Sequence, residues 1–234
     1  SMLRIGVVCD PAVLLKLLQS DDREERFLAR RVLAMIPEDT WKDEYLSSPS
    51  SRLVVQSALT LITQSPNRTN AMLVLDSLAR LTKNFISDAD FVDLLRVVQV
   101  TMHLVTPDGE QAQAWSELVS SEFPAGNSVI NAELVRIAAY LKCDLVPEIL
   151  KYLQTDTSMP ERVLIAMHLP QMPHDWTSKE RMASLQFLES AQKERGGGSY
   201  HLYVMNTSNA LSDLLTEEES IRILSLGEEY PNAA

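Results

Sequence analysis

The sequence of 234 residues contains little glycine, little cysteine and few aromatic residues. Its 7 glycines argue against an all-β fold, because such folds need glycine at many tight turns. The two cysteines, Cys9 and Cys143, are too few for an extracellular disulfide framework, and neither lies in a C-x-x-C or haem-attachment pattern. Either a disulfide or two unpaired thiols fits the pair, and we expect buried, unpaired thiols.

Long apolar runs and excess positive charge are also missing. No apolar run reaches the roughly 20 residues that span a bilayer, so we expect no membrane insertion. The opening residues 3–9 are too short and unflanked for a signal peptide, and Ser1-Met2 resembles a tag scar, which predicts a fragment of a longer protein. A net charge of −11 argues against nucleic acid as a partner, since such binders neutralise phosphates with Lys and Arg.

What the chain does contain is one amphipathic helix after another. Apolar residues recur at helical spacing, and Ser, Thr, Asp and Asn precede the periodic stretches as caps. Two of the expected helices follow caps at Ser87-Asp88 and Thr106-Pro107-Asp108, the second ending at Glu122. The others are expected at 11–18, 23–36, 41–46, 52–63, 70–84, 127–142, 144–154, 160–169, 178–194, 199–215 and 216–226.

About a dozen helices with short loops are typical of helical repeat proteins. Residues 27–33 and 53–59 have similar patterns and predict two successive inner helices of the HEAT type, although no strict period is present. We therefore predict an all-α fold, an irregular α-solenoid of HEAT- or armadillo-like hairpins. It is expected to be one domain over 1–234, with a possible subdivision into 1–122 and 123–234.

The predicted helix at 23–36 has an apolar face and a basic cluster. In the helix at 23–36 the expected buried face is apolar and consists of Phe27, Leu28, Val32, Leu33 and Ile36. The same helix carries the one basic cluster of the chain, which lies among acidic residues: Arg23, Arg26, Arg30 and Arg31. We interpret this cluster as a solvated helix face with local ion pairs.

Candidate chemical sites are sparse. His168 and His174 flank a short proline-containing segment with Asp175 nearby, but the close pairs typical of zinc sites are absent, and we expect no metal. His168 is interpreted as a cation at a helix C-terminus. The aromatic and polar cluster after the glycines at 196–198 adds three further surface-site candidates, namely Tyr200, His201 and Tyr203.

The remaining polar patterns have structural interpretations. Asp88/Asp90 and Glu217/Glu218/Glu219 are expected in the first turns of helices, where acidic groups offset the dipole. The glycines at 196–198 lack the Lys-Ser/Thr of a phosphate loop and are interpreted as a C-cap and turn. The tryptophans Trp41, Trp115 and Trp176 are expected to anchor helix packing.

The second half of the chain resembles a known bacterial family in a set of structural motifs. These are Phe123-Pro124-Ala125-Gly126, Asn131 to Arg136, Tyr140-Leu141, Glu161-Arg162 with Met167-His168-Leu169, Trp176-Thr177 with Glu180-Arg181, Gly196 to Tyr200, Asn206, Ala210 and Leu215 to Glu219. They resemble the HEAT-like region of large planctomycete-type proteins, described as membrane-bound dehydrogenase-like or haem-binding, in which a β-propeller precedes and a c-type cytochrome domain follows. The resemblance implies a helical connector of a periplasmic or cell-surface redox protein, with haem held elsewhere in the parent protein.

These observations favour a non-catalytic scaffold, spacer or docking module with no cofactor of its own. Its partner is expected to be a neighbouring domain or another protein, and a basic one given the net charge. A free-standing HEAT-type adaptor that binds a protein or peptide is the alternative. A third hypothesis is an enzyme whose site is assembled from the loops around His168, His174 and His201.

Overall fold

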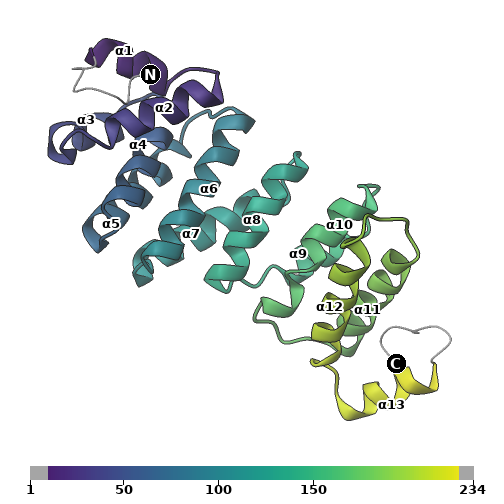
Figure 1. The fold of residues 1–234 in the computed structure, drawn as a ribbon. Coiled ribbons are helices and arrows are strands. Elements are labelled where there is room, and N and C mark those ends of the chain that lie inside the picture. The colour runs from purple at the N-terminus through teal and green to yellow at the C-terminus, as the bar shows by residue number, and fades with distance from the viewer. Residues whose placement is uncertain (1–9, 227–234) are drawn as a thin grey trace. The chain divides into compact units, whose positions relative to one another are not determined.

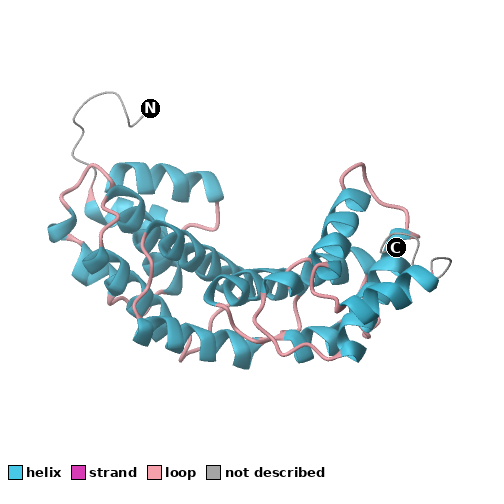
Figure 2. Ribbon diagram, turned by 90° about the horizontal axis from the view of Figure 1, so that it is seen from below, coloured by secondary structure: helices cyan, strands magenta, loops and turns pink. Residues whose placement is uncertain are grey.

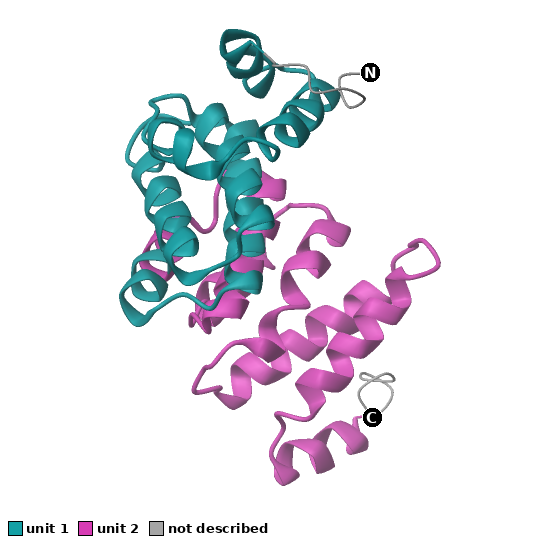
Figure 3. Ribbon diagram, turned by 60° about the vertical axis from the view of Figure 1, so that its left-hand side comes forward, with its two compact units in different colours: residues 1–115 teal, residues 116–234 magenta. Residues whose placement is uncertain are grey.

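Residues 10–226 are described by the computed structural model, and they form α-helices, short 3-10 helices and loops without a strand (Figure 2). The predicted all-α class is therefore confirmed. The chain divides into two compact units, residues 1–115 and residues 116–234, called unit 1 and unit 2 below (Figure 3). No helix within 10–226 is long and apolar enough to cross a membrane.

Unit 1 is built around a central helix, α4. In chain order its elements are α1 (Pro11–Leu18), α2 (Arg23–Leu33), the 3-10 helix η1 (Glu38–Thr40), α3 (Lys42–Leu46), α4 (Ser51–Gln64), α5 (Arg68–Leu81), α6 (Asp88–Leu104) and the first part of α7 (Gly109–Glu122) (Figure 1). Helix α4 packs against α1, α2, α3, α5 and α6. Its apolar face is buried and consists of Leu53, Val54, Ala58, Leu61 and Ile62.

Helix α2 differs from its prediction in length and in its buried face. It ends at Leu33, three residues before the expected end, and the turn at 34–36 leads to Pro37. Ala29 and Leu33 are fully covered, whereas Phe27 and Leu28 are each 48% exposed. The expected face was therefore wrong for Phe27 and Leu28 and confirmed for Leu33, because small Ala29 lies against the core where Phe27 and Leu28 were expected.

Unit 2 contains the remaining helices. These are the last part of α7, α8 (Ser128–Leu141), α9 (Val146–Tyr152), α10 (Met159–Ala166), the 3-10 helix η2 (Leu169–Gln171), α11 (Ser178–Gln192), α12 (Tyr200–Ser212) and α13 (Glu217–Ser225). Helix α10 packs on α8, α9 and α11, and α12 packs on α11 and η2. Capping boxes begin α11 and α13, where Thr177 pairs with Glu180 and Thr216 with Glu219.

The predicted first-turn positions of the acidic residues are confirmed in α6 and α13. The prediction that the glycines at 196–198 form the C-cap of the preceding helix was wrong. Lys193 caps α11, and none of the described glycines has a positive φ. Gly196 is instead required by a close approach, since an added Cβ would lie 2.3 Å from the ring of Tyr200. Cys143 is a buried free thiol, and Cys9 lies outside the described residues.

Candidate functional site

An arginine-lined cleft of about 300 Å³ lies in unit 1 where α2, α4 and α6 meet. Arg23, Arg26 and Arg30 follow one another at spacings of three and four residues along α2, which places them on one helix face. Arg96 reaches the same cleft from α6. The remaining lining residues are apolar or neutral apart from one aspartate: Val55, Gln56, Leu59, Asp93, Val97 and Val100.

Two of these arginines are held in place by the surrounding backbone and side chains. Arg26 donates from Nη1 to the carbonyl oxygens of Ser20 and Asp21, both at 2.9 Å. Arg30 donates from Nη1 to the side-chain carbonyl of Gln56, a residue that is only 3% exposed. Because these bonds fix the guanidinium groups, their positive charges point at the cleft without needing a ligand to order them.

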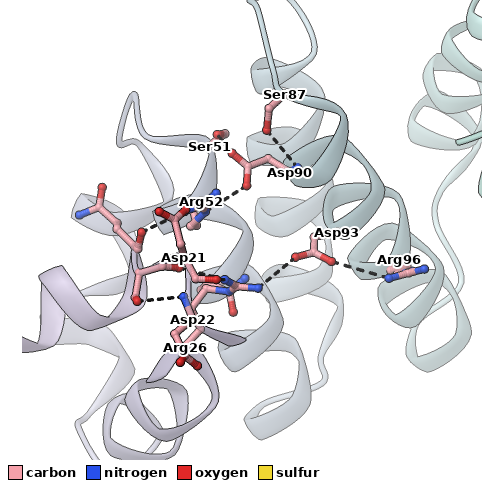
Figure 4. A network of polar contacts seen from close by, with 12 residues as sticks. Asp21, Asp22, Arg26, Ser51, Arg52, Ser87, Asp90, Asp93 and Arg96 are labelled. Atoms are coloured by element: carbon pink, nitrogen blue, oxygen red, sulfur yellow. Dashed lines mark hydrogen bonds and ion pairs between the residues drawn. The ribbon is translucent and has the colours of Figure 1, made fainter. Parts of the chain in front are cut away.

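Asp93 is the single carboxylate among the described residues that line the cleft, and Figure 4 shows it between two arginines. Its Oδ2 lies 3.9 Å from Nη2 of Arg26, and its Oδ1 lies 3.9 Å from Nη1 of Arg96. Both distances exceed a hydrogen bond, so Asp93 offsets the arginines only loosely. Burial and the nearby charge of Arg26 lower the pKa of Arg30. Arg23, Arg26 and Arg30 outnumber Asp93 among the described residues that line the cleft, which gives the lining an excess of positive charge.

A separate arginine, Arg52 of α4, holds the helices that form the cleft (Figure 4). Its Nε donates to Oδ1 of Asp90 at 3.1 Å, and its Nη1 pairs with Asp21. Ser51 donates to the other oxygen of Asp90 at 2.9 Å. Since Asp21 precedes α2 and Asp90 lies in the first turn of α6, Arg52 ties α2, α4 and α6 together.

The interpretation of the basic cluster as a solvated face with local ion pairs is wrong for Arg26 and Arg30. Both side chains reach across to neighbouring segments, and Asp22 is used instead to cap α2 by accepting from the backbone N–H of Glu24 and Glu25. The sequence did hold the relevant signal in the spacing of Arg23, Arg26 and Arg30. The contribution of α6, through Asp93 and Arg96, was missed because no local pattern links them to α2.

The histidine candidates of unit 2 occupy separate surroundings. His174 lies between two carboxylates, with Nδ1 2.9 Å from Asp144 and Nε2 3.3 Å from Glu180. Partial burial lowers the pKa of His174, but the two carboxylates outweigh burial and the net shift is upward. Its ring meets Trp176 edge-on at 5.5 Å between centroids. His174 therefore joins the loop after α8 to the start of α11.

His168 follows α10 and is neutral. Burial, with help from Arg136, lowers the pKa of His168 to about 4, so its interpretation as a helix-end cation was wrong. Tyr200 and His201 meet edge-on at 5.4 Å, and the Tyr200 hydroxyl donates to the carbonyl of Ala191 at 3.0 Å. Tyr203 is 53% exposed on the same helix. The aromatic cluster thus forms in part, with Tyr200 serving the packing of α11 against α12.

Trp41 and Trp115 are buried, as predicted for packing anchors, and Trp176 is partly covered beside His174. Within residues 10–226 no three His, Cys, Asp or Glu side chains are arranged to hold a metal ion. Comparison of the chain with protein-family models, curated proteins and solved structures finds no match in any of the three.

Proposed function

We propose that this chain is a non-catalytic, protein-binding helical scaffold, and that unit 1 holds an acidic segment of a partner protein in the arginine cleft. One observation carries the proposal: a chain with net charge −11 gathers four arginines around a single cleft that contains one carboxylate. Such clusters recognise acidic motifs through charge-assisted hydrogen bonds. The proposal revises the expectation of a basic partner, because local charge governs a contact of this size more than net charge does.

The finer architecture belongs to the same proposal. We infer an irregular α-solenoid of HEAT-like hairpins, in which α2 and α4 are successive inner helices. Their direct packing supports this assignment, as does the packing of α4 on α6, the second helix after it. Inner helices of repeat arrays line binding surfaces, and the cleft is lined by α2, α4 and α6.

The resemblance of the second half extends the proposal to cellular context. As a connector in an exported redox protein, the scaffold would position a neighbouring domain and carry no haem itself. As a free-standing adaptor, it would bind a separate partner through the same cleft. Both versions require the cleft to bind an acidic segment, so one experiment tests them together.

The experiment measures binding of a fluorescent glutamate-rich peptide to the full chain by fluorescence anisotropy. The double reversal Arg23→Glu with Arg96→Glu changes two exposed rim arginines and leaves the anchored Arg26 and Arg30 in place. We expect affinity to fall by about tenfold or more, about 1.4 kcal/mol, since each reversal replaces attraction with repulsion.

The matched control is Arg31→Glu with Arg195→Glu. Both arginines are exposed and lie outside the cleft, and the control carries the same net charge as the test variant. Affinity within about twofold of the unaltered chain is expected for the control. Equal losses in both variants would mean that net charge alone governs binding, and the proposal would then fail.

A further inference from the structure

We propose that the preferred occupant of the arginine cleft is a phosphorylated serine or threonine of the partner segment, with an apolar side chain beside it. This inference rests on the proposed function, because it names the ligand class of the same site. It goes further in predicting that a plain carboxylate satisfies the cleft incompletely.

The charges that line the cleft favour a phosphate over a single carboxylate. Asp93 lies 3.9 Å from both Arg26 and Arg96, while Arg26 and Arg30 make their hydrogen bonds to uncharged oxygens of Ser20, Asp21 and Gln56. A glutamate side chain adds one further negative charge, which leaves the cleft cationic. A phosphomonoester brings about −1.5 to −2 charges to one point, together with three strong acceptor oxygens. It therefore matches the excess of positive charge better than one carboxylate does.

The arginine donors of the cleft are also arranged in a way that suits a phosphate. Arg26 and Arg30 are already fixed by Ser20, Asp21 and Gln56, so they form a preorganised pair on α2. Arg96 is 54% exposed in its side chain and faces Arg26 across Asp93. Donors from two helices that line one cleft suit a tetrahedral group with acceptors on several sides. Preorganisation also lowers the ordering cost of binding.

The apolar part of the cleft lining favours an aliphatic residue next to the phosphate. Leu59 and Val100 line the cleft and are partly exposed, and Val55 and Val97 also line it and are buried. Contact with such a surface favours a peptide that carries an aliphatic residue next to its phosphate. A nucleic acid offers many phosphates but no aliphatic side chain, and the net charge of −11 opposes a long polyanion.

The test compares three fluorescent peptides of one sequence, which contain serine, glutamate or phosphoserine at a single position next to leucine. Binding to the full chain is measured at constant ionic strength. We expect the phosphoserine peptide to bind about tenfold or more tightly than the glutamate peptide, which in turn binds more tightly than the serine peptide. The Arg23→Glu/Arg96→Glu variant should lose most of the difference between phosphoserine and glutamate.

Each outcome has a definite meaning. Equal affinity for glutamate and phosphoserine overturns the phosphate inference but leaves the acidic-segment function standing. No binding of either peptide overturns the proposed function as well. Inorganic phosphate or a single-stranded oligonucleotide that displaces the phosphopeptide at equal concentration would show a general anion site or a nucleic-acid site, and would also overturn the inference.

A gain-of-binding variant guards against loss of fold as an explanation. Asp93→Asn keeps the shape of the side chain and removes the carboxylate that competes with the ligand for Arg26 and Arg96. We expect the phosphoserine peptide to bind several-fold more tightly to Asp93→Asn than to the unaltered chain. Unchanged or weaker binding would contradict the placement of the phosphate between these arginines.

Discussion

Arg181 of unit 2 and the arginines of the cleft in unit 1 serve opposite purposes. In unit 2, Arg181 of α11 is paired with the buried Glu219 of α13 through two hydrogen bonds of 2.8 and 3.0 Å. In unit 1, Arg26 and Arg30 face a cleft in which cations outnumber carboxylates. Paired charges in unit 2 hold helices together, whereas the cleft of unit 1 keeps charges close that repel one another.

The difference distinguishes an arginine that is paired with a buried carboxylate from arginines that we propose bind an acidic ligand. A buried pair is costly to break, because removing one partner leaves the other charge uncompensated. A cluster of like charges is costly to keep, and an added anion lowers that cost. Substitutions of the same kind should therefore have opposite effects in the two units, which makes the comparison open to direct measurement.

The largest effect is expected for Arg181→Met in unit 2. The substitution leaves the carboxylate of Glu219 buried without its bidentate partner, and we expect the free energy of unfolding to fall by about 2–3 kcal/mol. Urea unfolding of the full chain and hydrogen exchange in α13 measure the loss. Lys179→Met, at an exposed position of the same helix, is the control and should change stability by less than about 0.5 kcal/mol.

The same pair predicts the acid response of unit 2. Hydrogen bonds from Arg181 lower the pKa of Glu219 to about 2 from its usual 4.5. The stability that this pair contributes is therefore complete above about pH 4.5 and is lost as the pH falls towards 2. Glu219→Gln should flatten the stability curve over this range in acid titrations. A curve as steep as that of the unaltered chain would show that Glu219 is not the group responsible.

His174 is expected to contribute less stability than Glu219, and with the opposite dependence on pH. Because Asp144 and Glu180 raise its pKa in the folded chain, the stability it contributes is complete below its ordinary value of 6.5 and is lost as the pH rises through the raised value. His174→Gln should remove about 1 kcal/mol near pH 6 and less near pH 8. His201→Gln, at an exposed site, is the control and should change stability by less than about 0.5 kcal/mol. Equal losses for His174→Gln at both pH values would contradict this account.

The smallest effect compares two arginines of one helix. Arg23 is the first residue of α2, where a cation opposes the helix dipole, and it adds to the repulsion felt by Arg30. Arg23→Gln should raise stability by about 0.3–0.5 kcal/mol while weakening binding of the acidic peptide. Arg31 lies in the last turn, so Arg31→Gln should lower stability slightly and leave binding unchanged. The same sign of stability change for both would contradict this role of Arg23.

The helices themselves follow closely from local pattern. The cap at Ser87 and the first-turn acidic residues of α6 and α13 depend on neighbours in sequence, and these predictions are confirmed. The prediction that Phe27 lies on the buried face of α2 was wrong. Whether Ala29 or Phe27 is buried depends on which helix packs against α2. The prediction that His168 is a cation was wrong for the same reason, since burial in the folded chain lowers its pKa.

The cleft was less predictable than the fold. Three arginines at helical spacing were visible, but their meaning depends on Gln56 of α4 and Asp93 of α6, which lie 26 to 33 and 63 to 70 residues away from them in sequence. Only tertiary packing shows that Asp93 is loosely paired and that Gln56 fixes Arg30. An excess of charge is a property of a surface, and no local stretch of sequence contains it.

Hydrogen exchange of the full chain, with and without a saturating acidic peptide, is the most direct test of the difference between the two units. We predict slower exchange in α2, α4 and α6, which line the cleft, and unchanged exchange in α8 to α13. Protection that appears in unit 2, or in neither unit while the peptide is bound, would contradict the assignment of binding to the arginine cleft.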